Sequence, residues 1–201
     1  MELLTQNSKI KKTSREFGVR LYNFGITAYK SQSGKLTCPF ADKCIKYCYA
    51  QKGAYSWSNV KPAFERRYEL TKTDDFIDAM SKEIDKKRPD FVRVHDSGDY
   101  YSRKYRDKWF RIMDKYHNVK FYSYTNSIPL FRDEQLPDNF DTIYSDGGKL
   151  AHTIDKQTER HSVVFDNEKD LNEQGYTDAS KYDLHATKWF TKNTKIGLIF
   201  H

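Results

Sequence analysis

All three cysteines of this chain lie within eleven residues, at Cys38, Cys44 and Cys48, in the segment TCPFADKCIKYCYAQKG. Thiolates are soft ligands that suit zinc and iron–sulfur clusters. In a reducing compartment, clustered cysteines are more often metal ligands or redox groups than disulfides. The segment therefore predicts a metal centre.

The spacing of these cysteines, C-x5-C-x3-C, bears on which metal they bind. A helical turn would place Cys44 and Cys48 on one face, and the longer gap lets Cys38 fold back toward them. Structural zinc sites use four ligands and C-x2-C pairs, and neither gap here is two residues. Three thiolates can hold an iron–sulfur cluster and leave one iron for another ligand or a substrate. Zinc and three unligated, reduced cysteines are the alternatives.

The residues around the cysteines also fit a negatively charged centre. Three lysines would offset the charge of a thiolate-bound cluster: Lys43, Lys46 and Lys52. Four aromatic side chains would either shield the centre from solvent or belong to an ordinary core: Tyr47, Tyr49, Tyr55 and Trp57.

A second polar group, HDSGD, follows a short apolar run. Its glycine permits a tight turn with positive φ. The loop would then present an imidazole and two carboxylates to a cation, a ribose or an amine. We therefore expect the whole loop to bind a cofactor: His95, Asp96, Ser97, Gly98 and Asp99.

Two further observations bear on the polar loops. Asp99 or Ser102 can cap the helix that follows, which is a structural alternative to ligand binding. A third loop, SDGG, adds Asp146 as a candidate cofactor-binding residue.

The positions of these loops depend on the strands and helices around them. Apolar runs predict strands at residues 19–27, 91–95, 119–124, 141–144, 162–165 and 195–200. Apolar positions at helical spacing predict helices at residues 59–70, 74–87 and 102–116. The second helix has an apolar stripe and Asp74 as its N-cap. The stripe consists of Phe76, Ile77, Met80 and Ile84.

Strands separated by helices or long crossovers are typical of parallel sheets. We therefore predict an α/β fold, a partial or open β/α barrel of about six mainly parallel strands. Such folds place their chemistry on the loops after the strands, and all three polar loops follow predicted strands.

Length and composition limit the remaining choices. The 201 residues predict a single domain spanning 1–201, whose core draws on 15 Tyr and 13 Phe. The net charge of +7 favours an anionic partner or nucleic acid, although a lysine-rich surface also serves solubility alone. Because no apolar run is long enough for a signal peptide or a membrane span, we expect a cytoplasmic protein without a membrane partner.

Four motifs run in one order through most of the chain: TCPFADKCIKYCYAQKGAY, NVKPAFERRYEL, VRVHDSGDYYS and IGLIFH. Together they resemble the gene product 88 family of bacteriophage proteins. Members of that family are thought to resemble radical SAM domains and to carry an iron–sulfur cluster. The resemblance implies a radical-SAM-like scaffold with a 4Fe-4S cluster on Cys38, Cys44 and Cys48, in the cytoplasm of an infected host.

Two details extend this resemblance. KCIKYCYA is similar to the end of the radical SAM cysteine loop, and residues 95–99 fall where those enzymes bind the amino group of S-adenosylmethionine. S-adenosylmethionine is therefore an implied second cofactor. Many relatives have a cysteine-rich segment where this chain reads DLHATKW, so His185 is a candidate fourth cluster ligand, and a surface histidine is the alternative.

Three functions follow from these features. The first is an iron–sulfur protein on a β/α-barrel scaffold with a redox, catalytic or structural cluster. The second is an active radical SAM enzyme with an unknown substrate. The third is a zinc-stabilised module that binds nucleic acid through its basic surface.

Overall fold

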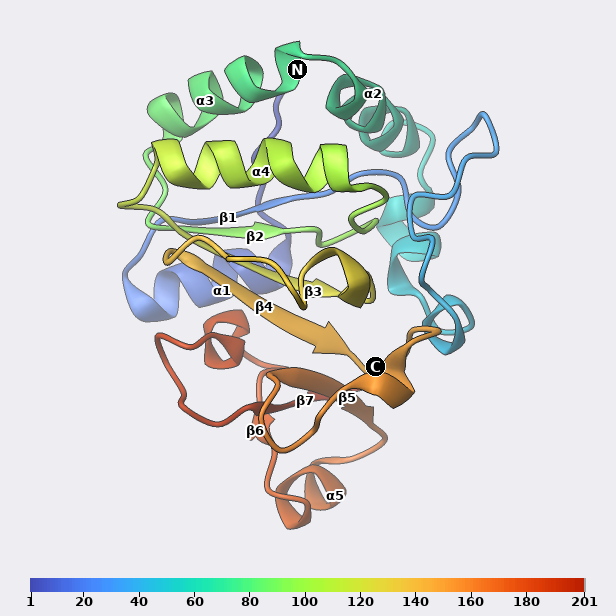
Figure 1. The fold of residues 1–201 in the computed structure, drawn as a ribbon, viewed down its shortest axis with the longest axis vertical. Helices are drawn as coiled ribbons and strands as arrows, with labels where there is room; N and C mark the ends of the chain where they lie inside the picture. The colour runs from blue at the N-terminus through green and yellow to red at the C-terminus, as the bar shows by residue number, and fades with distance from the viewer. Residues whose placement is uncertain (201) are drawn as a thin grey trace.

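A curled, fully parallel sheet of seven strands forms the centre of the computed structural model, which describes residues 1–200. The strand order is β1-β2-β3-β4-β5-β7-β6, and the curl makes a half-barrel with helices against both faces (Figure 1). The predicted open β/α barrel is confirmed, with seven strands in place of about six.

The strand predictions agree with the structure to within a few residues. The strands are β1 (Leu21–Phe24), β2 (Phe91–Val94), β3 (Lys120–Thr125), β4 (Phe140–Ser145), β5 (His161–Phe165), β6 (Thr177–Asp178) and β7 (Lys195–Ile199). The seventh strand, β6, has only two residues, Thr177 and Asp178, and no apolar pattern from which it could be predicted.

Five α-helices connect and cover these strands: α1 (Ser8–Phe17), α2 (Lys61–Lys72), α3 (Asp75–Lys87), α4 (Arg103–Lys115) and α5 (Glu168–Glu173). Ser102 caps α4, since its Oγ accepts a hydrogen bond from the Tyr105 N–H at 3.2 Å. Asp74 occupies the N-cap position of α3, as predicted, but its backbone is helical and its side chain makes no capping hydrogen bond.

Helices α2, α3 and α4 lie together on one face of the sheet and form the larger core (Figure 1). Trp109 of α4 is fully buried, with ring centroids 5.2 Å from Phe24 and 5.5 Å from Phe76. The predicted stripe on α3 contributes Phe76, Met80 and Ile84 to this core, and Ile77 packs at its margin. Aromatic rings thus join three elements of the fold.

The opposite, concave face of the sheet holds a smaller core built on α1 and the 3₁₀ turn η6 (Asp183–Ala186). Helix α1 was not predicted, because only Ile10 and Thr13 of its ten residues are buried and the apolar signal is weak. Just before α1, Thr5 pairs antiparallel with Asn23 along the outer side of β1.

Among residues 1–200, none of the helices combines the length and the apolar character that a bilayer-spanning helix needs.

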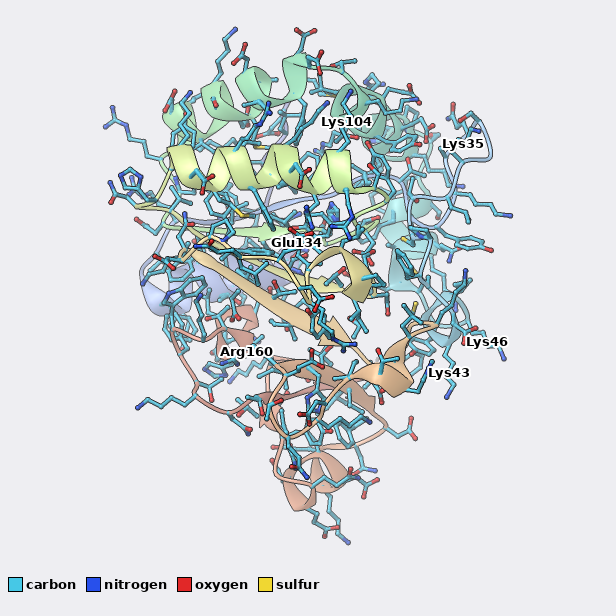
Figure 2. All side chains as sticks on the ribbon, in the orientation of Figure 1. Lys35, Lys43, Lys46, Lys104, Glu134 and Arg160 are labelled. Atoms are coloured by element: carbon cyan, nitrogen blue, oxygen red, sulfur yellow. The ribbon has the colours of Figure 1, made fainter. Side chains whose placement is uncertain are left out.

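The packing of Trp109 gives a stability prediction. Trp109→Ala leaves a large cavity among aromatic rings, so we expect the free energy of unfolding to fall by about 3–5 kcal/mol in urea titrations followed by circular dichroism. Lys104→Ala, at an exposed position on the same helix (Figure 2), serves as the control and should change it by less than about 0.5 kcal/mol. Equal losses in the two variants would contradict this packing.

Candidate functional site

A cavity of about 1080 Å³ opens at the carboxyl ends of the strands. The loops after β1, β2 and β4 all contribute to its walls, so the cysteine segment, HDSGD and SDGG meet here. In Figure 1 the segment between β1 and α2 lies at the ends toward which the strand arrows point. The parallel sheet therefore brings together loops that are far apart in the sequence.

Cys38, Cys44 and Cys48 all line this cavity, each half-buried and none in a disulfide. The predicted helical turn from Cys44 to Cys48 is wrong. Cys44 lies in the 3₁₀ turn η1 (Lys43–Ile45), whereas Cys48 is extended and precedes η2 (Tyr49–Gln51). One reason is that the Cys44 N–H donates to the Gly147 carbonyl at 3.1 Å, which holds η1 against the loop after β4.

The close approach of these two loops depends on a glycine. A Cβ at Gly147 would lie 2.9 Å from the Cys44 Cβ and from the Tyr47 hydroxyl. The glycine pair after β4 therefore does more than turn the chain, because Gly147 makes room for the cysteine segment.

The three thiols share a cavity without forming a single-ion site. Among residues 1–200, no group of three or more His, Cys, Asp and Glu side chains is arranged to hold one metal ion. Burial raises the pKa of the Cys38 and Cys44 thiols, and the charge of Asp99 adds to this effect. Asn126 Nδ2 donates to Cys44 Sγ at 3.7 Å.

The loop after β2 contains a left-handed residue at His95, with φ of 65°, as well as the predicted one at Gly98, with φ of 77°. His95 Nε2 is 2.9 Å from the Tyr105 hydroxyl, and the two rings are stacked. Burial, assisted by the charge of Arg93, lowers the His95 pKa to about 3. His95 is therefore a neutral imidazole that ties the loop to α4.

The acidic residues of this loop are also largely engaged within the protein. Asp99 accepts hydrogen bonds from Thr125 Oγ1 at 2.6 Å and from the Asn126 N–H at 2.9 Å, while burial raises its pKa to about 6. Ser97 Oγ donates to the Ile26 carbonyl at 2.8 Å. These contacts connect the loops after β1, β2 and β3 and brace the rim of the cavity.

Asp96 lies at the centre of a second group of contacts. Its Oδ2 accepts from Asn23 Nδ2 at 2.6 Å and from the Tyr55 hydroxyl at 2.9 Å. Its Oδ1 has no partner within residues 1–200 and lies against Gly25, where any Cβ would collide with it. Burial raises the Asp96 pKa, and the carboxylate holds one aromatic wall of the cavity in place.

The floor of the cavity rests on an ion pair that the sequence analysis missed. Arg93 Nη1 of β2 donates to Asp183 Oδ1 of η6 at 2.9 Å, and Lys9 Nζ of α1 lies 2.8 Å from the same oxygen. The Tyr122 hydroxyl donates to Asp183 Oδ2 at 2.6 Å. The available signal was the charged residue inside the apolar run FVRV, which requires a buried partner.

This ion pair controls the charge of the floor. Burial alone would raise the Asp183 pKa, but Arg93, Lys9 and Tyr122 outweigh burial and hold that pKa below its usual 3.8. Arg93 Nη2 also donates to the Tyr49 hydroxyl at 3.4 Å. The floor therefore contains a fixed carboxylate and a fixed guanidinium.

Two remaining candidates lie in different surroundings. Asp146 lines the cavity and forms an ion pair with Lys156 at 3.2 Å. His185 does not line the cavity. Its ring packs edge-on against Phe17 and Tyr182, with both centroid distances 5.6 Å. The structure does not bring His185 together with the cysteines.

The fold and the cavity define a class, an α/β protein whose parallel half-barrel carries a thiol-lined cavity at the carboxyl ends of its strands. The chain belongs to the gene product 88 family, whose family model matches residues 1–199. The family resemblance in the motifs is thereby confirmed.

Two phage proteins are among the similar sequences. The chain is 31% identical over 101 residues to the Gene 88 protein of Mycobacterium phage D29. The aligned region covers 44% of this chain and 42% of that protein. It is 27% identical over 123 residues to the Gene 88 protein of Mycobacterium phage L5, covering 54% and 52%. The chain thus spans about half the length of the curated relatives it matches. No solved structure matches the chain.

The ion pair between Arg93 and Asp183 predicts that a conservative substitution of Asp183 greatly lowers the free energy of unfolding. Asp183→Asn leaves the Arg93 guanidinium buried without a counter-charge, so we expect a loss of about 3–5 kcal/mol in the free energy of unfolding. Asp133→Asn, at an exposed acid without an ion pair among residues 1–200, should change it by less than about 0.5 kcal/mol. Chemical denaturation of both variants at neutral pH tests this, and an Asp183→Asn loss no larger than that of the control contradicts it.

The same carboxylate predicts a pH dependence. A group whose pKa is lower in the folded than in the unfolded state stabilises the fold above its unfolded pKa, and this contribution is lost as the pH falls through the folded pKa. We therefore expect the stability of the wild type to fall more steeply below about pH 4 than that of Asp183→Asn. The measurement is the free energy of unfolding of both proteins at a series of pH values. If it falls equally steeply below about pH 4 in the two proteins, Asp183 is not the group concerned.

Proposed function

We propose that this protein is an iron–sulfur protein that holds a 4Fe-4S cluster through Cys38, Cys44 and Cys48 in the host cytoplasm. The observation that carries the proposal is that every cysteine of the chain lines one cavity, at the end of a parallel sheet where such folds have their chemistry. A reducing cytoplasm keeps these thiols available for metal.

The spacing of the cysteines supports a cluster over zinc, because structural zinc sites use C-x2-C pairs and neither gap here is two residues. A single zinc ion holds each sulfur about 2.3 Å from one point, and no set of three His, Cys, Asp and Glu side chains among residues 1–200 has that arrangement. In a 4Fe-4S cluster each thiolate binds a different iron, so the sulfurs surround a larger body. All three thiols line one cavity of about 1080 Å³, which has room for such a body.

The rest of the chain would control access to such a cluster. When bound, the cluster supplies one-electron redox chemistry. Tyr47 and Tyr55 line the cavity and limit its exposure to water, and Gly147 leaves room for the cysteine segment against the loop after β4.

Metal analysis of anaerobically purified protein tests this proposal. We expect about four iron atoms and about four sulfide ions per chain, with broad absorption at about 400 nm. Replacing any one of the three cysteines by serine should lower the iron content severalfold, because each thiolate binds its own iron. Zinc without iron, or iron content unchanged in all three serine variants, contradicts the proposal.

His185→Ala serves as the control because His185 lies outside the cavity. The variant should keep its iron, and circular dichroism should confirm that it folds. Loss of iron from folded His185→Ala would instead support the histidine as the fourth ligand.

A second candidate is a radical SAM enzyme, and the extent of the cavity favours it. The same cavity that contains the cysteines reaches Asp96 and Asp99, which leaves room for a cofactor beside a cluster. The test adds S-adenosylmethionine and dithionite to the iron-loaded protein and measures 5′-deoxyadenosine. Release of 5′-deoxyadenosine by the wild type, reduced at least tenfold by each cysteine-to-serine change, supports this function. No release from protein with a full cluster contradicts it.

A further inference from the structure

Exposed apolar side chains gather in this cavity, and the proposed cluster gives no reason for them. Four of the seven large hydrophobic side chains exposed among residues 1–200 line this one cavity: Tyr49, Trp57, Val164 and Phe200. Trp57 is 60% exposed and Tyr49 is 54% exposed. Large exposed apolar groups gathered in a concavity mark a binding surface.

The ring of Tyr49 is held in place although its surface is open. Its hydroxyl donates to the Asp96 backbone carbonyl and accepts from Arg93 Nη2 at 3.4 Å. The edge of the ring is thus anchored to the floor while its surface remains free in the cavity.

The segment that contributes Tyr49 and Trp57 is rich in lysine, and its Lys43 lines the cavity together with Lys9 and Lys11 of α1. Residues 28–61, part of which lines the cavity, carry six lysines and a single carboxylate, Asp42. All six lysines are exposed, and none is in an ion pair within residues 1–200: Lys30, Lys35, Lys43, Lys46, Lys52 and Lys61. Figure 2 shows Lys35, Lys43 and Lys46 along the same side of the molecule.

Open aromatic rings beside a basic wall match the chemistry of one class of ligand. Proteins bind single-stranded nucleic acid by stacking its bases on aromatic side chains while lysines follow its phosphates. A duplex keeps its bases stacked on one another and cannot offer them to a concavity. We propose that the mouth of this cavity binds single-stranded nucleic acid, with bases on Trp57 and Tyr49 and phosphates on the lysines of residues 28–61.

This inference does not depend on the cluster. The rings that carry it line the cavity, the lysines belong to the segment 28–61, and none of these residues is a cysteine. Iron content and nucleic-acid affinity can therefore be measured separately on each variant, so failure of one proposal leaves the other standing.

Fluorescence anisotropy of the full chain with labelled oligonucleotides of about 12 nucleotides tests the inference. We expect single-stranded DNA or RNA to bind at least tenfold more tightly than the duplex of the same sequence. The affinity should fall as salt rises from about 50 to 200 mM, since bound phosphates release counterions. Competition with a mononucleotide shows whether one nucleotide unit is enough or several are needed.

Paired variants separate stacking from charge. Trp57→Ala should weaken binding about tenfold, whereas Trp57→Phe, which keeps an aromatic face, should stay within about threefold of the wild type. Lys43→Gln and Lys46→Gln should each reduce the slope of log affinity against log salt by about 0.7. Lys86→Gln is the matched control, at an exposed lysine near the end of α3 that leads into β2, and should leave the slope unchanged.

Several outcomes would overturn the inference. Equal affinity for single strands and duplex, or no binding at about 50 mM salt, removes the case for stacked bases. An unchanged affinity in Trp57→Ala, or equal effects of Lys43→Gln and Lys86→Gln, would show that a nonspecific basic surface is responsible. Binding of an acidic peptide but of no oligonucleotide would assign the surface to a protein partner instead.

Discussion

The buried pair of Arg93 and Asp183 is the interaction on which the concave side of this protein depends. Two charges removed from water are costly unless hydrogen bonds replace the lost hydration. Here Asp183 also binds Lys9 and Tyr122, so one carboxylate joins α1, β2, β3 and η6. These contacts hold α1 and η6, which are far apart in the sequence, against the same face of the sheet. The geometry of Tyr49 follows from the ion pair, since Arg93 contacts that hydroxyl.

The long segment between β1 and α2 has no α-helix or strand of its own and takes its shape from the sheet edge. The Asp99 N–H donates to the Thr37 carbonyl at 3.1 Å, and the Lys149 N–H donates to the Phe40 carbonyl at 2.8 Å. Together with the contact between Cys44 and Gly147, these bonds fix the segment at intervals along its length. The loops after β2 and β4 therefore determine where the cysteines lie.

The sequence was informative where local pattern and tertiary environment agree. Apolar runs located six strands, and the wide stripe on α3 located a helix that packs on them, so the parallel half-barrel could be predicted. The sequence pattern did not predict the conformation of segments that are held by contacts with distant parts of the chain. The turn at Cys44 is held by the loop after β4, helix α1 buries only a narrow polar–apolar stripe, and His95 is oriented by Tyr105. The meeting of three polar loops could be predicted from topology alone, whereas the partners of each side chain could not.

A half-barrel sheet has two edge strands, here β1 and β6, and the two edges are protected in different ways. At β1, the Asn23 N–H donates to the Thr5 carbonyl at 2.8 Å, and the Asn23 carbonyl accepts from the Thr5 N–H at 2.9 Å. At the other side, β6 offers only two residues. Unpaired strand edges invite another chain to add a strand, and short or covered edges prevent it. Both margins of the sheet are thus protected against the addition of a strand from a second chain.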